Sequence, residues 1–108
     1  MPRKLFETER SWGLVASVAG PEVSIIVNIV VEPKSLDDVV KRLRDYPWVV
    51  DLYEVTGDFD VVALVKAPNV ATFRNLLKEK ILAVEGVRST NSVVILYTHK
   101  REGRKVEV

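Results

Sequence analysis

The chain has 108 residues, 47% of them hydrophobic and 29% charged, which suits a single domain with one apolar core. Lysine and arginine total 16 against 15 acidic residues, so no overall field attracts a polyanion or an acidic membrane, and the absence of cysteine excludes disulfides and thiolate zinc sites. The N-terminus is polar and no apolar run is long enough to span a membrane, so we expect a cytoplasmic protein without membrane contact or cofactor. Abundant Val, Ile, Lys, Arg and Glu without glutamine is a thermophile-like usage.

The first predicted strand and helix lie between residues 24 and 45. Ser24 to Glu32 places large aliphatic side chains at every second position, which is the period of a strand. Pro33 ends this strand, and Ser35 is a candidate cap for a helix over Leu36 to Asp45. The helix carries one apolar stripe, at the spacing of a single buried face: Leu36, Val39, Val40 and Leu43.

The remaining elements follow in the order strand, strand, helix, strand. Strands over Val49 to Val55 and Asp60 to Lys66 form a hairpin around the turn Thr56 to Phe59, where Gly and Asp favour tight turning. A second helix spans Asn69 to Leu82, and a fourth, long strand spans Val87 to Tyr97. The side chains expected to face inward from the second helix are Val70, Phe73, Leu76, Leu77 and Ile81.

This βαββαβ order predicts an α+β fold of the ferredoxin-like type, a four-stranded antiparallel sheet with both helices on one face. The opposite face would then expose aliphatic side chains such as Ile26 and Val30, together with others from 61–65 and 93–96. Because a large apolar patch marks an interface, we expect a sheet-to-sheet homodimer or a higher oligomer.

The two ends of the chain differ in composition from its centre. We expect residues 1–23 to form an extension with a short strand over 13–18, residues 24–98 to form the domain, and residues 99–108 to form a basic, frayed tail. Too few residues precede Ser24 for a helix-turn-helix unit.

Several segments resemble the ligand-binding domain of the Lrp/AsnC regulators. The resemblance rests on Glu54 to Asp60 (EVTGDFD), the helix Asn69 to Leu82, the segment Val84 to Val87 (VEGV), and Arg88 to Ser92 (RSTNS) leading into Val93 to Leu96 (VVIL). Residues 13–18 also look like the linker strand of the full-length family members. The chain thus resembles a stand-alone version of this domain, without the helix-turn-helix half.

The resemblance implies a binding protein that modulates transcription regulators. It would bind an amino acid or a related small effector, form a homodimer or a higher oligomer, and co-assemble with a full-length Lrp/AsnC regulator, without direct DNA binding. A zwitterion needs acceptors for its ammonium, donors for its carboxylate and a wall for its side chain. The candidate ligand-binding residues are Thr56, Gly57, Asp58, Phe59, Asp60, Thr90 and Ser92.

Plainer interpretations compete with each of these assignments. Thr56 to Asp58 also suits an ordinary hairpin turn, and Asp60 is the better candidate for a structural cap. Thr90 to Ser92 is equally an edge-strand segment whose polar side chains limit pairing, and Asn28 suits a satisfied polar group at an interface. A ligand-free oligomerisation module is the main functional alternative.

Catalysis and nucleic-acid binding find less support. The lone His99 has no partner at metal-ligand spacing, and no phosphate-cradling loop or catalytic cluster occurs, so we expect no enzyme and place a small dimeric α+β barrel enzyme last. RNA-binding versions of this fold carry aromatic residues on the two central strands, which are aliphatic here.

Overall fold

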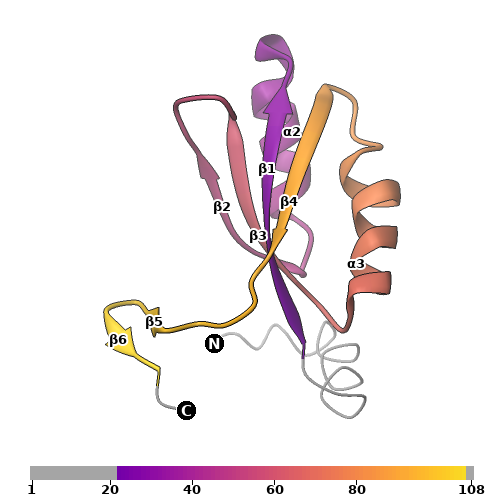
Figure 1. The fold of residues 1–108 in the computed structure, drawn as a ribbon. Coiled ribbons are helices and arrows are strands. Elements are labelled where there is room, and N and C mark those ends of the chain that lie inside the picture. The colour runs from indigo at the N-terminus through magenta and orange to yellow at the C-terminus, as the bar shows by residue number, and fades with distance from the viewer. Residues whose placement is uncertain (1–21, 107–108) are drawn as a thin grey trace.

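The computed structural model describes residues 22–106, and Figure 1 shows their arrangement. The sheet has the strand order β2-β3-β1-β4, with each neighbouring pair antiparallel. This confirms the ferredoxin-like α+β fold. The elements are β1 (Val23–Val31), the 3-10 turn η1 (Pro33–Ser35), α2 (Leu36–Arg44), β2 (Val49–Glu54), β3 (Val61–Ala67), α3 (Val70–Leu76), the wider helical turn η2 (Leu77–Ile81), β4 (Val87–Val94), β5 (Lys100–Arg101) and β6 (Arg104–Lys105).

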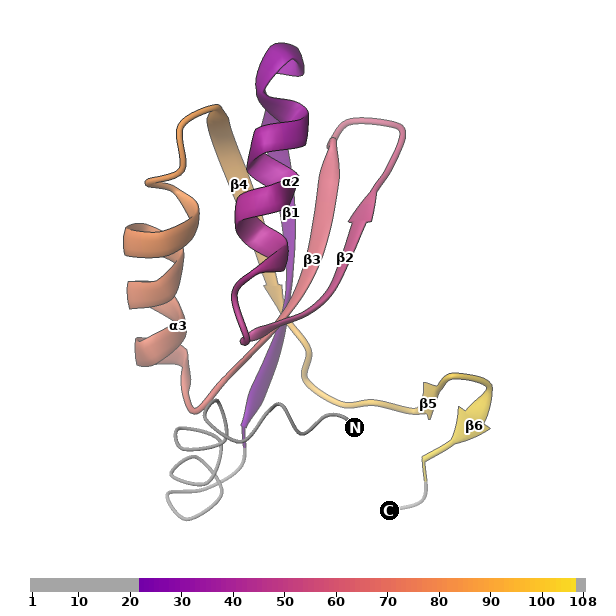
Figure 2. The same cartoon turned by 180° about the vertical axis from the view of Figure 1, so that it is seen from behind.

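The hydrophobic core lies between the sheet and the helices. In Figure 2, α2 lies in front of the strands and α3 stands to the left of β4, both on the side of the sheet away from the hairpin β5–β6. The alternation along β1 and β3 turns every second side chain into this layer, where α2 adds Val39 and Leu43 from the predicted stripe. The fully buried large side chains are Ile25, Val27, Ile29, Val39, Leu43, Val61, Val65 and Ile81. The helix-facing side of the two central strands, β1 and β3, is therefore closed to solvent.

The start of α3 agrees with the sequence prediction, and the start of α2 differs from it. The sequence predicted Asn69 as the start of the second helix, and in the structure its side chain caps α3 by accepting a hydrogen bond from the Thr72 backbone at 2.7 Å. Ser35 precedes α2, but its side chain makes no capping bond, because Ser35 belongs to the turn η1 and has a helical backbone conformation (φ -103°, ψ 0°) where a capping residue is extended. The predicted inward position of Val70 is wrong: this first residue of α3 is 53% exposed.

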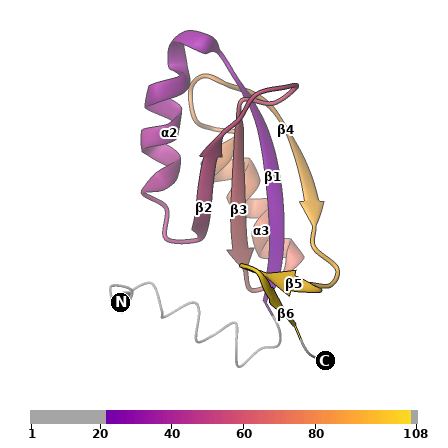
Figure 3. The same cartoon turned by 90° about the vertical axis from the view of Figure 1, so that its left-hand side faces the viewer.

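We call the other side of the sheet the open face, and Figure 3 views the molecule from this side. Cross-strand pairing aligns its side chains in rows that cross all four strands. One row is Asp51, Leu64, Ile26 and Val93, and the next row is Tyr53, Val62, Asn28 and Asn91. The Asn28 side-chain amide donates to the Asn91 side-chain oxygen at 3.5 Å, so Asn28 has a polar partner on this largely apolar surface.

The end of the chain differs from the expected long strand and frayed tail. β4 ends at Val94, because its neighbour β1 begins at Val23 and offers one last hydrogen bond, from the Ile95 N–H to the Ser24 carbonyl at 2.9 Å. The chain then leaves the sheet and forms the small hairpin β5–β6. Its central residues, Glu102 and Gly103, both have positive φ, +50° and +80°, which is the conformation of a type I′ hairpin turn.

Two further sequence expectations concern the N-terminal extension and membrane-spanning helices. The N-terminal extension 1–23, with its strand over 13–18, lies almost wholly outside the described residues. Within residues 22–106, no helix has the length and apolarity that a membrane crossing requires. The domain boundaries drawn from the sequence therefore stay predictions.

Candidate functional site

The candidate effector loop joins β2 to β3 and includes five of the predicted site residues. It is longer than the predicted four-residue turn, since the Val55 N–H donates to the Asp60 carbonyl at 3.0 Å and closes a six-residue connection. Gly57 has φ +109°, and an added Cβ there would meet nothing within 4 Å. Glycine is therefore required by the backbone conformation and not by packing.

The polar groups of this loop fall into two kinds. The Asp60 carboxylate accepts a hydrogen bond from the Val31 N–H at 2.8 Å, where β1 ends, which confirms its structural role. Thr56 and Asp58 are exposed, and within residues 22–106 their side chains make no hydrogen bond to the protein. A shallow hollow of about 610 Å³ borders the loop at Glu54, Val55 and Thr56. A hydroxyl, a carboxylate and a glycine backbone are thus presented to solvent together, while Phe59 is half-buried.

Thr90 and Ser92 lie elsewhere in the same copy. They pair across the sheet with Ile29 and Val27, so both point to the helix-facing side of β4. β4 is an edge strand, and β1 separates it from β3, where the loop ends. One copy therefore does not bring these hydroxyls together with Asp58, and their role as ligand contacts stays a prediction that requires a second copy.

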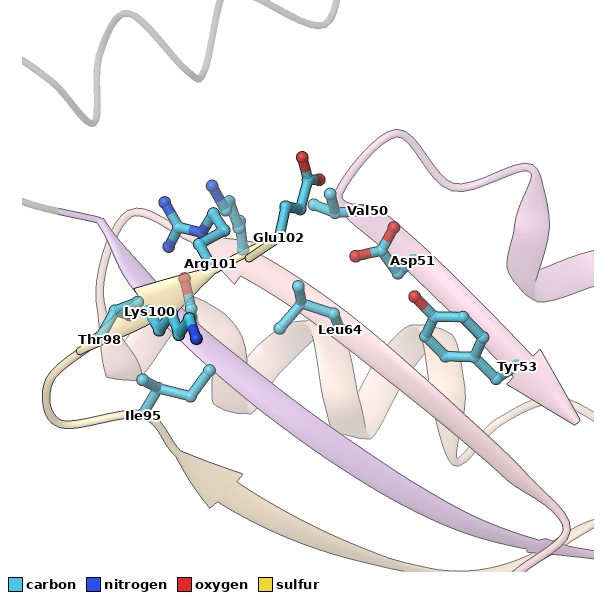
Figure 4. Close-up of a pocket in the computed structure, with 11 residues that line it drawn as sticks. Val50, Asp51, Tyr53, Leu64, Ile95, Thr98, Lys100, Arg101 and Glu102 are labelled. Carbon is cyan, nitrogen blue, oxygen red and sulfur yellow. The ribbon is translucent and has the colours of Figure 1, made fainter. Parts of the chain in front are cut away.

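A second hollow, of about 470 Å³, was missed by the sequence reasoning. It lies where the chain beyond β4 passes the open face, as Figure 4 shows. The lining residues come from two strands, the start of β1 and the C-terminal hairpin: Ser24, Val50, Asp51, Tyr53, Leu64, Lys66, Ile95, Thr98, Lys100, Arg101 and Glu102. The signal that could have revealed it is Gly103, since glycine readily adopts the positive φ that a tight hairpin turn requires.

The hollow combines opposite charges with an apolar floor. Asp51 and Glu102 face the same space as Lys66, Lys100 and Arg101, around the side chain of Leu64. Within the described part of the chain, none of these carboxylates forms an ion pair with a cation of the hollow; the Glu32–Arg88 pair, at 3.4 Å, lies apart from it. Residues 22–106 also contain no cluster of three or more side chains suited to a metal ion.

Comparison with known proteins decides the family. The family described as Lrp/AsnC ligand binding domain matches residues 24–104. The chain belongs to this family. The HTH-type transcriptional regulator FL11 of Pyrococcus furiosus is 32% identical over 89 residues, which cover 78% of this chain and 58% of that protein. This Lrp/AsnC domain thus spans about half the length of the curated relatives it matches.

Solved structures show the same fold. TTHA0845 from Thermus thermophilus has a TM-score of 0.69 and 26% identity, covering 73% of this chain and 99% of that one. The transcriptional regulator NMB0573 of Neisseria meningitidis, solved as a complex with L-Met, has a TM-score of 0.70 and 17% identity, covering 73% of this chain and 53% of that one. FL11 and the LysM protein of Saccharolobus solfataricus, which is 32% identical over 78 residues, are both named HTH-type transcriptional regulators and not enzymes.

Proposed function

We propose that this Lrp/AsnC domain binds an amino acid or a closely related small molecule and couples that binding to its self-assembly. The observation that carries the proposal is the exposed loop at Gly57, where Thr56 and Asp58 have no partner within the described residues. The L-Met complex of the Neisseria regulator supports the choice of ligand class. The assignment matches the chemistry of a zwitterion, whose ammonium seeks a carboxylate.

The loop supplies only part of such a site. Asp58 can accept from an ammonium, and the Gly57 backbone allows a ligand to approach closely. Donors for the ligand's carboxylate are then required from a neighbouring copy, for which Thr90 and Ser92 are our candidates. Binding between copies is a direct route from effector to assembly, because the occupied site exists only in the assembled state.

We place the interface of the basic unit, a homodimer, on the open face. Its rows present Ile26, Val62 and Leu64 beside Tyr53, and Val93 is 48% exposed at the edge strand. Burying this surface against a second sheet is favourable in proportion to the apolar area removed from water. The Asn28–Asn91 pair would lie inside that contact, where a paired polar group favours one register.

Isothermal calorimetry against a panel of proteinogenic amino acids tests the ligand. The account predicts saturable heat for one or a few of them, with at least about tenfold weaker binding in Asp58→Ala, the loss of one charge-assisted contact. Gly57→Val should also lose binding. The control is Asp38→Ala, an exposed carboxylate on α2, which should bind as the parent does. Unchanged binding in both loop variants would refute the site, and a silent panel would refute the ligand class.

A ligand-free oligomerisation module is the second candidate. Its support is that Gly57 and Asp60 already have structural reasons to be present, the first in its positive φ and the second in its bond to Val31. A silent panel together with an intact oligomer would favour it. In either case, co-assembly with a full-length family regulator and a cytoplasmic location stay predictions, and a pull-down with such a regulator tests the first.

A further inference from the structure

The C-terminal arm, defined as residues 95–106, is an ordered protrusion. The Ile95 N–H holds its base on β1, and the Val106 N–H donates to the His99 carbonyl at 3.0 Å to close the hairpin. The rings of Tyr97 and His99 meet edge to face with centroids 4.7 Å apart. Figures 1 and 3 show the arm leaving the end of β4 and standing out from the open face.

Within the described residues, several apolar side chains of the arm remain exposed to solvent. Leu96 is 93% exposed, Tyr97 is 47% exposed and Val106 is 38% exposed. A two-stranded hairpin is marginally stable in water unless it packs against another surface. An arm with fixed hydrogen bonds and uncovered Leu96 is therefore suited to contact a partner.

The position of the arm points to a partner on the open face. Stacked sheets lie about 10 Å apart. A second sheet packed on the open face would therefore have one of its edges beside the arm. The hollow between the arm and the residues Asp51, Tyr53 and Leu64 is the space at that corner. The arm and this part of the open face thus line the same hollow.

The charges identify the kind of partner. The hairpin carries four exposed basic residues: Lys100, Arg101, Arg104 and Lys105. The β2 edge and the loop that follows it carry the exposed carboxylates Asp51, Glu54 and Asp58. A surface with one basic and one acidic part complements itself when two copies are related by a two-fold axis, since each arm then meets the other copy's acids.

We propose that the C-terminal arm grips a second copy of this chain, with Leu96 and Tyr97 against the partner and the basic hairpin toward its acidic β2 edge. The inference rests on the open-face dimer of the proposed function and adds a second contact to it. The arm makes assembly sensitive to salt, because its ionic contacts are screened while the apolar ones are not.

Because the chain has no cysteine, a dye can be attached at one chosen position. We would label Leu96→Cys with an environment-sensitive fluorophore and compare it with Leu82→Cys, an aliphatic position that is 43% exposed beyond α3. The same two labels in a Val62→Asp background, which disrupts the open face, give the monomer reference. The emission at position 96 should shift to the blue in the dimer only, and the emission at position 82 should be equal in both backgrounds.

The light-scattering mass of each labelled sample separates the possible failures. A doubled mass with unshifted emission at position 96 would overturn the arm proposal and leave the open-face dimer standing, with the arm free for another anionic partner. A monomeric parent protein would overturn both. As a second measurement, Arg101→Glu with Arg104→Glu should weaken dimerisation at least about tenfold at low salt and reverse its salt dependence, because salt then screens a repulsion from the acidic β2 edge. Unchanged affinity and salt dependence would contradict the ionic part.

Discussion

The two faces of the sheet use the same strands in opposite ways. On the helix-facing side, β1 turns Ile25, Val27 and Ile29 into a layer with no solvent exposure. On the open face, the alternate residues Ile26 and Val30 are only half-buried, with no helix above them. The same strand therefore contributes to the buried core on one side and to a partly exposed apolar surface on the other.

The difference separates the residues that stabilise a single copy from those available for contact between copies. A sheet that faced water would carry mainly polar residues on that side, but β1 and β3 place the aliphatic Ile26, Val30, Val62 and Leu64 there, beside the polar Ser24, Asn28 and Lys66. Such strands suit burial on both faces, and the helices of one copy cover only one of them. The stability of the single copy should thus depend on the helix-facing residues of β1, and its self-association on the alternate residues of the same strand.

Adjacent positions of β1 give the sharpest test of this comparison. Ile29→Ala should lower the free energy of unfolding by about 2–5 kcal/mol, since it opens a cavity in the core. Val30→Ala, one residue further on the open face, should cost less than about 1 kcal/mol in a single copy. Urea unfolding in the Val62→Asp background measures both without a contribution from association. Equal losses at the two positions would contradict the division between the faces.

Two glycines with positive φ extend the comparison to loops. Gly86 has φ +101°, and a Cβ added there would overlap the Ser35 Cβ and lie 3.3 Å from the buried Val39 side chain. Gly86→Ala therefore combines backbone strain with a clash, and should cost about 2–5 kcal/mol. Gly57→Ala carries the strain alone and should cost about 1–3 kcal/mol. Thermal unfolding of the two variants ranks them, and the reverse order would contradict the packing around Ser35.

The loop carboxylate Asp60 should have the smaller effect of a lost hydrogen bond. Asp60→Ala leaves the Val31 N–H without its acceptor and should lower stability by about 1–3 kcal/mol. Asp60→Asn keeps an acceptor oxygen and should recover most of that loss. Effector affinity, scaled to the folded fraction, should be unaffected by Asp60→Asn, because we assign ligand contact to Asp58. Weaker binding with unchanged stability would move the ligand contact to Asp60.

Periodicity and turn chemistry predicted most of the fold. The stripe at Val39 and Leu43, the start of the second helix at Asn69 and the four sheet strands are local features, so the sequence reveals them directly. The end of β4 depends instead on where β1 begins, which is a property of the paired sheet. The hairpin after Tyr97 was missed because its basic composition outweighed the turn signal at Gly103.

The candidate site was predictable only in part. The turn signal located the Gly57 loop and its exposed Asp58, and it also identified Asp60 as a structural group. The placement of Thr90 could not be inferred, because the face that a strand residue occupies follows from its register, here opposite the buried Ile29. The predicted ligand contact of Thr90 requires a second copy, and the position of that copy cannot be inferred from the sequence of one chain.

The central claim is that the open face joins two copies of this chain. Light scattering coupled to size-exclusion chromatography, at micromolar concentration, tests it most directly on the unmodified protein. The account predicts a mass of at least twice 12.2 kDa, falling to 12.2 kDa in Val62→Asp with an unchanged circular dichroism spectrum. A mass of 12.2 kDa for the unmodified chain, or an undiminished oligomer in the variant, would contradict it.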